Sequence, residues 1–368
     1  MRIFLLGATP SFDVGAHLTI AGKLAQTGGN TGNQLIAYGL LKSLAYDEVD
    51  WDHAKGPQYV DENFDVILIA AANFLFPGFD FGGMAEFISK TKLPVVMVGL
   101  GAQSKDYSPK IELKPGTSRL MSIVAERTKL IGVRGPFTRD VLANLGIHNV
   151  QVVGCPSYYM NGPEPPPLRK GPLPDRPRIA INASRDVLGH AFDRDKMRNA
   201  VFGLTAEAVR YDGTFVAQTE REEMILAERP GSPEAAGALT SLAAFFSDAA
   251  VDAAAFRSWA ERRMRVYWSV EAWLEDMKSL DFVVGTRFHG AMAPLKIGTP
   301  AFVLCHDTRT TEMSKFLGLP HANIVELDRI DLKELYDRVD VDAIGARWTE
   351  LLPLYRQFLA TNGLRYRY

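Results

Sequence analysis

Short apolar runs alternate with amphipathic helical patterns along this chain, and the whole alternation occurs twice. Runs rich in Val and Ile predict strands in the first half at residues 3–6, 65–71, 95–99, 130–133 and 150–153. A second series predicts strands at residues 178–182, 214–218, 265–268, 282–284, 301–304 and 323–325. Continuous apolar strands separated by helices are typical of a parallel sheet with helices on both faces. The sequence therefore predicts an α/β protein with two such sheets.

A proline-rich segment separates the two series. Residues 161–177 contain seven prolines, which exclude a helix or a central strand and indicate an extended linker. We therefore expect a Rossmann-like N-terminal domain at 1–160, the linker at 161–177, a Rossmann-like C-terminal domain at 178–340 and a C-terminal helix at 341–368 that packs back on the first domain. Two domains of this kind predict a ligand site in the cleft between them.

The charge balance excludes one class of partner. The 368 residues carry 41 Lys and Arg against 43 Asp and Glu, a formal net charge of −2, whereas nucleic-acid binders usually show a basic excess. Two cysteines are too few for a disulfide framework and suit a reducing compartment. The first apolar run is too short for a secretion signal, and no run approaches the length of a membrane span. We expect a cytoplasmic protein and leave open contact with the inner face of a membrane.

A glycine-rich loop, residues 27–33, precedes an expected helix at residues 32–44. Gly29 and Gly32 allow the backbone to approach a ligand closely, and the N–H groups of the helix start attract an anion or sugar oxygens. Asn30 and Asn33 add polar side chains to the same loop. A flexible turn capped by these asparagines explains the pattern equally well. The loop is not a P-loop, because no Gly-Lys-Ser/Thr follows.

A strand in the first half ends in Arg134, directly before a helix predicted from Pro136. In doubly wound sheets the carboxyl ends of the strands face the ligand crevice, so Arg134 is a candidate anion-binding residue. The sequence 99–104 matches only half of a dinucleotide fingerprint, because Ser104 replaces its third glycine. A nicotinamide cofactor is therefore not expected.

The strongest signal is Arg287-Phe288-His289, where a buried strand ends and a helix begins close behind. In an extended segment, residues two apart point the same way, so Arg287 and His289 are expected to face one ligand. A guanidinium, an imidazole and a helix N-terminus together form an anion site with a titratable group beside it.

Two further arginines are expected at neighbouring strand ends. Arg185 follows the first strand of the second series, and Arg309 follows the strand at residues 301–304. Convergence of Arg185, Arg287 and Arg309 on one crevice indicates a multiply charged ligand such as a phosphate ester. The alternative is three separate surface ion pairs.

Metal chemistry is not indicated. The seven histidines are scattered, neither cysteine has a CxxC partner, and no HExxH occurs. We interpret Cys155 and Cys305 as small buried apolar residues.

These motifs together resemble the polysaccharide pyruvyl transferase family. Gly-Gly-Asn-Thr-Gly-Asn-Gln-Leu-Ile, Gly-Leu-Gly-Ala-Gln, Val-Arg-Gly-Pro-Phe-Thr-Arg-Asp, Gly-Cys-Pro-Ser and Gly-Thr-Arg-Phe-His-Gly follow one another in the family's order, from about Thr27 to Leu319. The resemblance implies a fold like that of GT-B glycosyltransferases, with an acceptor side in the first domain and a phosphoenolpyruvate side in the second. It implies transfer of pyruvate from phosphoenolpyruvate to a sugar diol as a cyclic ketal, with phosphoenolpyruvate as co-substrate and no further cofactor. The acceptor is a saccharide or a lipid-linked precursor.

The resemblance also implies roles for residues. Arg185, Arg287, the backbone of Phe288 and His289 correspond to the donor contacts, and Arg309 is a weaker match. Arg287 and His289 are the expected catalytic pair, and His289 is the first candidate for the acid that protonates the donor, because a histidine pKa lies near working pH. A role for His289 in charge stabilisation alone stays open. Many members carry Asp where this chain has Asn33, so Asn33 is not expected to act as a base.

Two other functions fit the same fold. One is a glycosyltransferase that uses a nucleotide-sugar, because a fold does not fix a function. The other is a non-catalytic protein that binds a sugar phosphate. The segment 219–264 matches nothing in the family pattern.

Overall fold

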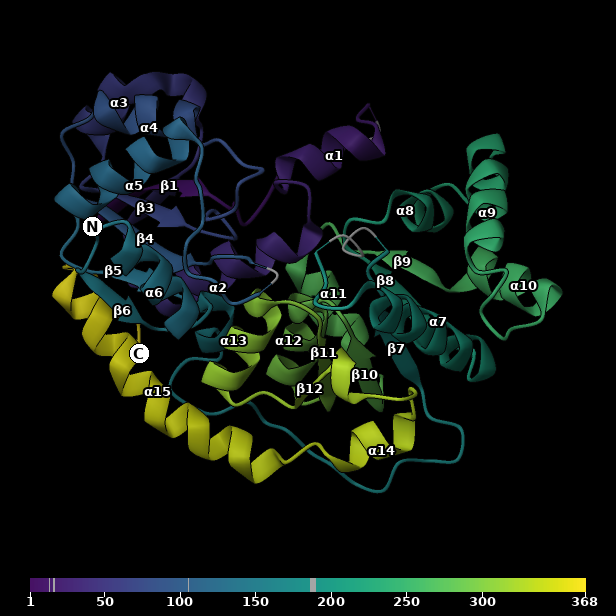
Figure 1. The fold of residues 1–368 in the computed structure, drawn as a ribbon. Coiled ribbons are helices and arrows are strands. Elements are labelled where there is room, and N and C mark those ends of the chain that lie inside the picture. The colour runs from purple at the N-terminus through teal and green to yellow at the C-terminus, as the bar shows by residue number, and fades with distance from the viewer. Residues whose placement is uncertain (13, 16, 105, 186–189) are drawn as a thin grey trace.

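The computed structural model describes residues 1–12, 14–15, 17–104, 106–185 and 190–368. Two six-stranded sheets lie side by side, each formed by one half of the chain (Figure 1). All strand pairs in both sheets are parallel. The predicted α/β class with two Rossmann-like units is confirmed.

The first sheet has the order β2-β1-β3-β4-β5-β6. Its strands are β1 Arg2–Gly7, β2 Glu48–Asp50, β3 Val66–Ala70, β4 Val95–Leu100, β5 Ile131–Val133 and β6 Val150–Val152. Its helices are α1 Ile20–Gln26, α2 Gln34–Ser43, α3 Gly56–Asn63, α4 Gly82–Ser89, α5 Pro115–Arg127 and α6 Pro136–Asn144. Ile3 and Leu5 pack on one face of the sheet while Phe4 packs on the other, so helices are needed on both faces.

The second sheet has the order β12-β11-β10-β7-β8-β9. Its strands are β7 Ile179–Asn182, β8 Thr214–Ala217, β9 Met264–Val266, β10 Phe282–Gly285, β11 Ala301–Cys305 and β12 His321–Asn323. Its helices are α7 Arg194–Arg210, α8 Arg221–Glu228, α9 Pro233–Phe245, α10 Ala253–Arg263, α11 Val270–Met277, α12 Phe288–Ile297, α13 Thr308–Leu317 and α14 Leu332–Asp337. Ser232 caps α9 by accepting from the Ala235 N–H, with Pro233 in the first turn.

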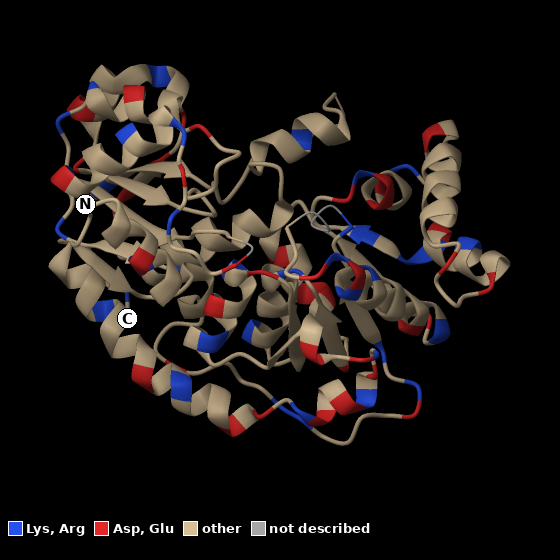
Figure 2. Ribbon diagram, in the orientation of Figure 1, with Lys and Arg blue, Asp and Glu red and all other residues tan. Residues whose placement is uncertain are grey.

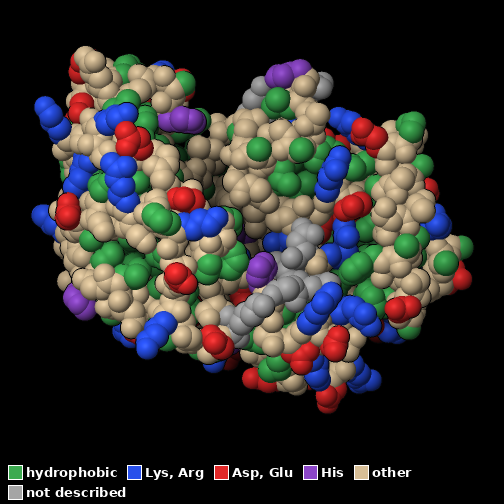
Figure 3. Space-filling view, turned by 45° about the horizontal axis from the view of Figure 1, so that its top comes forward, with side chains coloured by type: hydrophobic (Ala, Val, Ile, Leu, Met, Phe, Trp, Pro, Cys, Tyr) green, Lys and Arg blue, Asp and Glu red, His purple; other side chains and the backbone are tan. Residues whose placement is uncertain are grey.

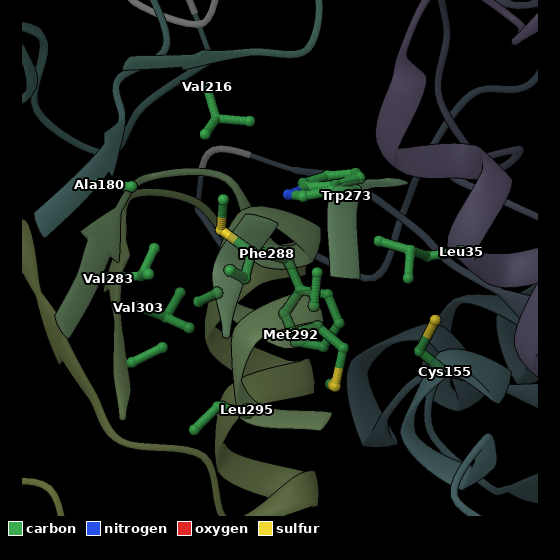
Figure 4. Packing of buried hydrophobic residues seen from close by; sticks show 14 of the residues in the cluster. Leu35, Cys155, Ala180, Val216, Trp273, Val283, Phe288, Met292, Leu295 and Val303 are labelled. Atoms are coloured by element: carbon green, nitrogen blue, oxygen red, sulfur yellow. The ribbon is translucent and has the colours of Figure 1, made fainter. Parts of the chain in front are cut away.

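The two sheets share one hydrophobic core. Leu35 of α2 and Cys155 lie across from Phe288 and Met292 of α12 (Figure 4). The last helix, α15 Val341–Thr361, leaves the second half and runs along the first sheet, with the C-terminus beside that sheet (Figure 1). Its end is fixed there, because the Asn362 side chain accepts from the Leu130 N–H at 3.0 Å and donates to the Leu130 carbonyl at 3.1 Å. The expected packing of this helix on the first domain is confirmed.

Several predicted boundaries are wrong for local reasons. The strand predicted at 323–325 is β12, two residues earlier, because the Asn323 side chain caps a 3-10 turn at Ile324–Glu326 by accepting from the Val325 N–H. The helix expected close behind Arg287-Phe288-His289 is α12, and it begins within this motif, at Phe288. Short or polar elements were not predicted, namely β2, α1, α3, α7, α8 and α14. Within 161–177 the structure has no helix or strand.

Positive and negative side chains are interspersed over both halves of the molecule (Figure 2). Among the helices of the described residues, none combines the length and the apolar character needed to cross a lipid bilayer.

Candidate functional site

A cavity of about 820 Å³ lies where the carboxyl ends of the two sheets face each other. A hollow is visible there between the lobe of the first sheet and the rest of the molecule (Figure 3). Its described lining includes three arginines, which are Arg134, Arg287 and Arg309, three histidines, which are His53, His190 and His289, and a group of phenylalanines. The cleft between the sheets is therefore the candidate site, as the domain pattern predicted.

The N-terminus of α12 forms one side of this cavity. Arg287 is its N-cap, and Phe288 and His289 occupy its first turn. The Arg287 N–H donates to the Asn182 side chain at 2.8 Å, which ties the start of α12 to the end of the neighbouring strand β7. The prediction that Arg287 and His289 share one side of an extended segment is wrong, because His289 is helical. Both residues line the cavity nevertheless.

Arg287 is held by a buried carboxylate. One of its terminal nitrogens donates to Glu220 at 2.5 Å and also contacts the Thr219 hydroxyl. Burial raises the pKa of Glu220, but the charge of Arg287 and the backbone N–H groups of Gln218 and Thr219 outweigh it and bring that pKa to about 2. Glu220 is therefore ionised at neutral pH and fixes the Arg287 guanidinium. The Nε atom of Arg287 is buried and has no partner among the described residues.

Arg309 lies in the first turn of α13 and contacts Asp307 at 3.3 Å. Asp307 also accepts a hydrogen bond of 3.0 Å from Gln103, which belongs to the first half of the chain. The Asp307 side chain caps α13 by accepting from the Thr310 N–H, which fixes the start of this helix at Thr308. Arg309 lines the cavity, as expected.

Arg185 lies outside the cavity lining, as far as the described residues show. Its guanidinium binds Glu223 through two hydrogen bonds of 2.8 and 2.7 Å and Glu222 through one of 2.8 Å, both in α8. Although burial lowers the pKa of Arg185, these two carboxylates raise it above its ordinary value. The predicted convergence of three arginines is thus reduced in this structure to Arg287 and Arg309, and Arg134 joins them from the other sheet.

His289 is neutral in this site. Burial lowers the pKa of His289 well below its ordinary value, and the charges of Arg134 and Arg309 lower it further. The expected reason for acid catalysis, a pKa near working pH, therefore does not hold for His289 in this structure. The His289 Nε2 atom lies 3.4 Å from the Cys155 sulfur, which in turn accepts a hydrogen bond of 3.1 Å from Ser157. Cys155, interpreted as an apolar residue, thus positions the imidazole ring.

Arg134 is 3% exposed and donates from Nε to the Gly99 carbonyl at 2.7 Å. Burial lowers its pKa. No carboxylate forms an ion pair with Arg134 among the described residues. Arg134 therefore lines the cavity with a guanidinium that is hydrogen-bonded to backbone carbonyls, and the nearby Glu312 carboxylate acts on it only through its charge.

The glycine-rich loop closes onto the second half of the chain. Gly29, Asn30 and Asn33 line the cavity, and Gly29 has a φ of +80°. Asn30 accepts from the Gly32 N–H at 2.8 Å, and Asn33 donates to the Thr27 carbonyl at 2.9 Å. The loop is therefore a turn capped by its asparagines, and the same turn also faces the cavity.

Gly32 lies where the loop meets the opposite domain, so a side chain there is expected to be costly. A Cβ on Gly32 would lie 2.5 Å from the buried Gln218 side-chain oxygen and 3.0 Å from the His289 Cβ. We expect Gly32→Ala to destabilise the protein by about 1–3 kcal/mol through overpacking. Urea unfolding of both proteins measures this difference. Gly237→Ala in α9 is the matched control, because its Cβ meets open space, and it should not destabilise.

Glu312 joins the two domains beside the cavity. It lies in α13 and accepts from the N–H and the hydroxyl of Thr138, at 3.1 and 2.6 Å, in the first turn of α6. Burial raises the pKa of Glu312 to about 7, against the opposing effect of the Thr138 hydrogen bonds. A Cβ on Gly135 would lie 2.4 Å from its carboxylate, which explains the glycine before Pro136.

The raised pKa of Glu312 predicts a pH-dependent stability. The folded state keeps a proton that the unfolded chain has already lost, so the free energy of unfolding falls as pH rises from about 4.5 to about 7. Glu312→Gln removes this titration. Its free energy of unfolding relative to the wild type should therefore increase from about pH 5 to about pH 8, measured by urea unfolding. Glu126→Gln, at an exposed position of α5, should show no such trend; equal trends in both variants would contradict the assignment.

Sequence reasoning missed one set of lining residues. Phe74, Phe76, Phe79 and Phe81 lie between β3 and α4 and all face the cavity. Four phenylalanines within eight residues after a strand end were a usable signal. Gln218, which follows β8, was missed as well.

In the described part of the chain, no group of three or more His, Cys, Asp or Glu side chains is arranged to hold a metal ion. The site therefore offers guanidinium groups, a neutral imidazole, helix N–H groups and an aromatic surface.

Comparison with models of protein families gives a match that covers most of the chain. A family model described as polysaccharide pyruvyl transferase matches residues 30–308. No curated protein matches significantly.

Solved structures similar to this chain include an S. aureus protein, MnaA, solved with UDP, at 13% identity and a TM-score of 0.44, covering 98% of this chain and 97% of that chain. A putative UDP-N-acetylglucosamine 2-epimerase from Listeria monocytogenes is 14% identical, with a TM-score of 0.42 and coverage of 97% and 95%. Anabaena HepE, solved with UDP, is 10% identical, with a TM-score of 0.41 and coverage of 99% and 98%. These similarities are too distant to bear on the ligand of this chain.

Proposed function

Because this chain belongs to the polysaccharide pyruvyl transferase family, we propose that it transfers pyruvate from phosphoenolpyruvate to two hydroxyl groups of a sugar acceptor. The product is a cyclic pyruvyl ketal, and phosphate is released. The observation that carries this proposal is the N-terminus of α12, where Arg287 and His289 face a cavity that also receives Arg134 and Arg309.

The charges of this site support an anionic donor. Arg287 and Arg309 are each paired with a carboxylate, so they act mainly as oriented hydrogen-bond donors, whereas Arg134 forms no such pair among the described residues. Phosphoenolpyruvate carries both a phosphate and a carboxylate, and guanidinium groups bind both in planar, bidentate fashion. The free N–H groups at the start of α12 favour the same charge.

The proposed reaction begins with transfer of a proton to the methylene carbon of the donor. This makes the adjacent carbon electrophilic, and one sugar hydroxyl adds to it and releases its own proton. The bond to the phosphate oxygen then breaks, phosphate leaves with the electron pair, and the second hydroxyl adds and loses its proton to close the ketal. Guanidinium groups stabilise the charge that moves onto the phosphate.

His289 is the proposed proton donor. Binding of phosphoenolpyruvate raises its pKa and so allows it to carry the proton. In the protein alone, the pKa of His289 is lowered by burial and by the charges of Arg134 and Arg309. A bound phosphate and carboxylate neutralise those two arginines and place negative charge nearby, which raises the pKa of His289. The His289 imidazole then takes up a proton only when phosphoenolpyruvate is bound.

We also propose a cytoplasmic location. Cys155 and Cys305 are both buried and unbridged, which suits a reducing compartment.

The test is turnover. Purified protein is incubated with phosphoenolpyruvate and a panel of methyl hexopyranosides, and phosphate release and the ketal methyl signal are followed by NMR. Sugar-dependent phosphate release with a new ketal signal supports the proposal. Release of phosphate without a ketal, or transfer from a nucleotide-sugar under the same conditions, contradicts it.

A further inference from the structure

Four phenylalanine rings form a continuous surface in the cavity. We call Phe74, Phe76, Phe79 and Phe81 the phenylalanine wall. Phe74 and Phe81 stack with ring centroids 4.1 Å apart, Phe79 lies 6.1 Å from Phe81, and Phe76 lies 5.4 Å from Phe79. Phe79 is 46% exposed, which is unusual for so large an apolar side chain. The wall therefore presents apolar surface to whatever enters the cavity.

The wall belongs to the domain opposite the donor residues. It follows β3 of the first sheet, whereas Arg287 and His289 start α12 beside the second sheet. Phe76 reaches across, because its ring meets the edge of His190 at a centroid distance of 5.2 Å. A hydroxyl that attacks a donor bound at α12 must come from a molecule in this same cavity, and the wall is the surface on the other side.

Two unsatisfied amide groups in the same cavity indicate a polar partner. The Asn73 side chain donates to Gln103, but its buried Oδ1 atom accepts no hydrogen bond from the described residues. The Gln218 side chain is 1% exposed, and its Nε2 atom likewise donates to none of them. Both residues line the cavity. A buried amide without a partner is costly, so a ligand is expected to supply one hydroxyl donor and one oxygen acceptor.

We propose that the phenylalanine wall, with Asn73 and Gln218, is the acceptor subsite and stacks against the apolar C–H face of a pyranose ring. A pyranose combines the two requirements, since its ring face is apolar while its edge carries hydroxyls. A hydrocarbon chain satisfies the rings but leaves both amides unpaired. The described lining contains no Asp, Glu or Lys, so the ring bound here is neutral or anionic and not an amino sugar cation. This inference rests on the proposed function for the identity of the donor.

The test is saturation-transfer NMR with a panel of neutral methyl hexopyranosides in the presence of phosphoenolpyruvate. For at least one member, the proposal predicts saturation of C–H protons on one ring face. Phe76→Ala/Phe79→Ala should weaken that binding at least about 5-fold, while binding of phosphoenolpyruvate, followed by ³¹P NMR, stays unchanged. The single variant Phe79→Trp should bind the sugar more tightly than the single variant Phe79→Ala, because an aromatic ring is again present at this position. Leu354→Ala, at an exposed position of α15, is the control.

Equal sugar binding by the wild type and the double variant would overturn the proposal. If no sugar of the panel binds, the proposal is also overturned. The same holds if a short-chain alkyl phosphate binds at the wall and displaces the sugars. A failure of the proposed function looks different, because phosphoenolpyruvate would then give no ³¹P signal of binding to the wild type.

Discussion

Arg287→Met is expected to reduce phosphate release from phosphoenolpyruvate by about 10²–10³-fold, as for the loss of one oriented donor to a developing anion. Arg287 occupies the N-cap position of α12, lines the cavity and has a buried Nε atom without a partner among the described residues. Phosphoenolpyruvate should also bind more weakly, because the same guanidinium contacts the ground state. Steady-state kinetics with the sugar that the turnover test identifies measures both effects.

This substitution also leaves Glu220 without its partner. A buried carboxylate that loses its cation costs about 3–5 kcal/mol, so the single variant is expected to be less stable than the wild type. The double variant Arg287→Met/Glu220→Gln removes both charges and should recover stability but not activity. Arg178→Met removes an exposed arginine that pairs with Asp281 and should change neither property. A folded double variant with near-normal turnover would refute the role of Arg287.

His289→Ala is expected to lower kcat by about 10²–10⁴-fold, the usual contribution of a general acid. The proposed role of His289 also predicts that the substitution changes the number of protons taken up when phosphoenolpyruvate binds. Binding of phosphoenolpyruvate to the wild type near neutral pH should take up protons, because the bound anion raises the pKa of His289 from its lowered value. Calorimetry in two buffers of different ionisation enthalpy measures this uptake, and His289→Ala should reduce it.

Two controls separate this role from a structural one. Cys155→Ala removes the thiol 3.4 Å from His289 Nε2, so it should shift the pH profile of kcat while keeping part of the activity. His148→Ala, at an exposed position, should leave kcat and proton uptake unchanged. Proton uptake that is the same in the wild type and in His289→Ala would show that another group receives the proton.

Much of the fold could be predicted from local sequence. The central strands β1, β3, β4, β7, β10 and β11 are buried on both faces and therefore appear as continuous apolar runs. The start of helix α9 is a local signal of the same kind, because Ser232 and Pro233 lie beside the N–H groups that they cap or replace. The edge strand β2 was not predicted, because three residues with only partial burial carry no periodic signal.

The partners of the site residues were beyond local reasoning. The position of Arg287 follows from a strand end, but its carboxylate partner, Glu220, lies elsewhere in the fold. Glu220, Glu222 and Glu223 belong to a segment that matches no family motif, and their contacts depend on how α8 packs. For the same reason the lowered pKa of His289 could not be predicted, since it depends on burial and on Arg134 from the opposite sheet.

Calorimetric titration with phosphoenolpyruvate, beside UDP and inorganic phosphate, tests the donor site most directly. We predict that phosphoenolpyruvate binds the wild type more tightly than either other ligand, and that Arg287→Met/Glu220→Gln removes this preference. Tighter binding of UDP, or binding of phosphoenolpyruvate that is unchanged in the double variant, would contradict the account.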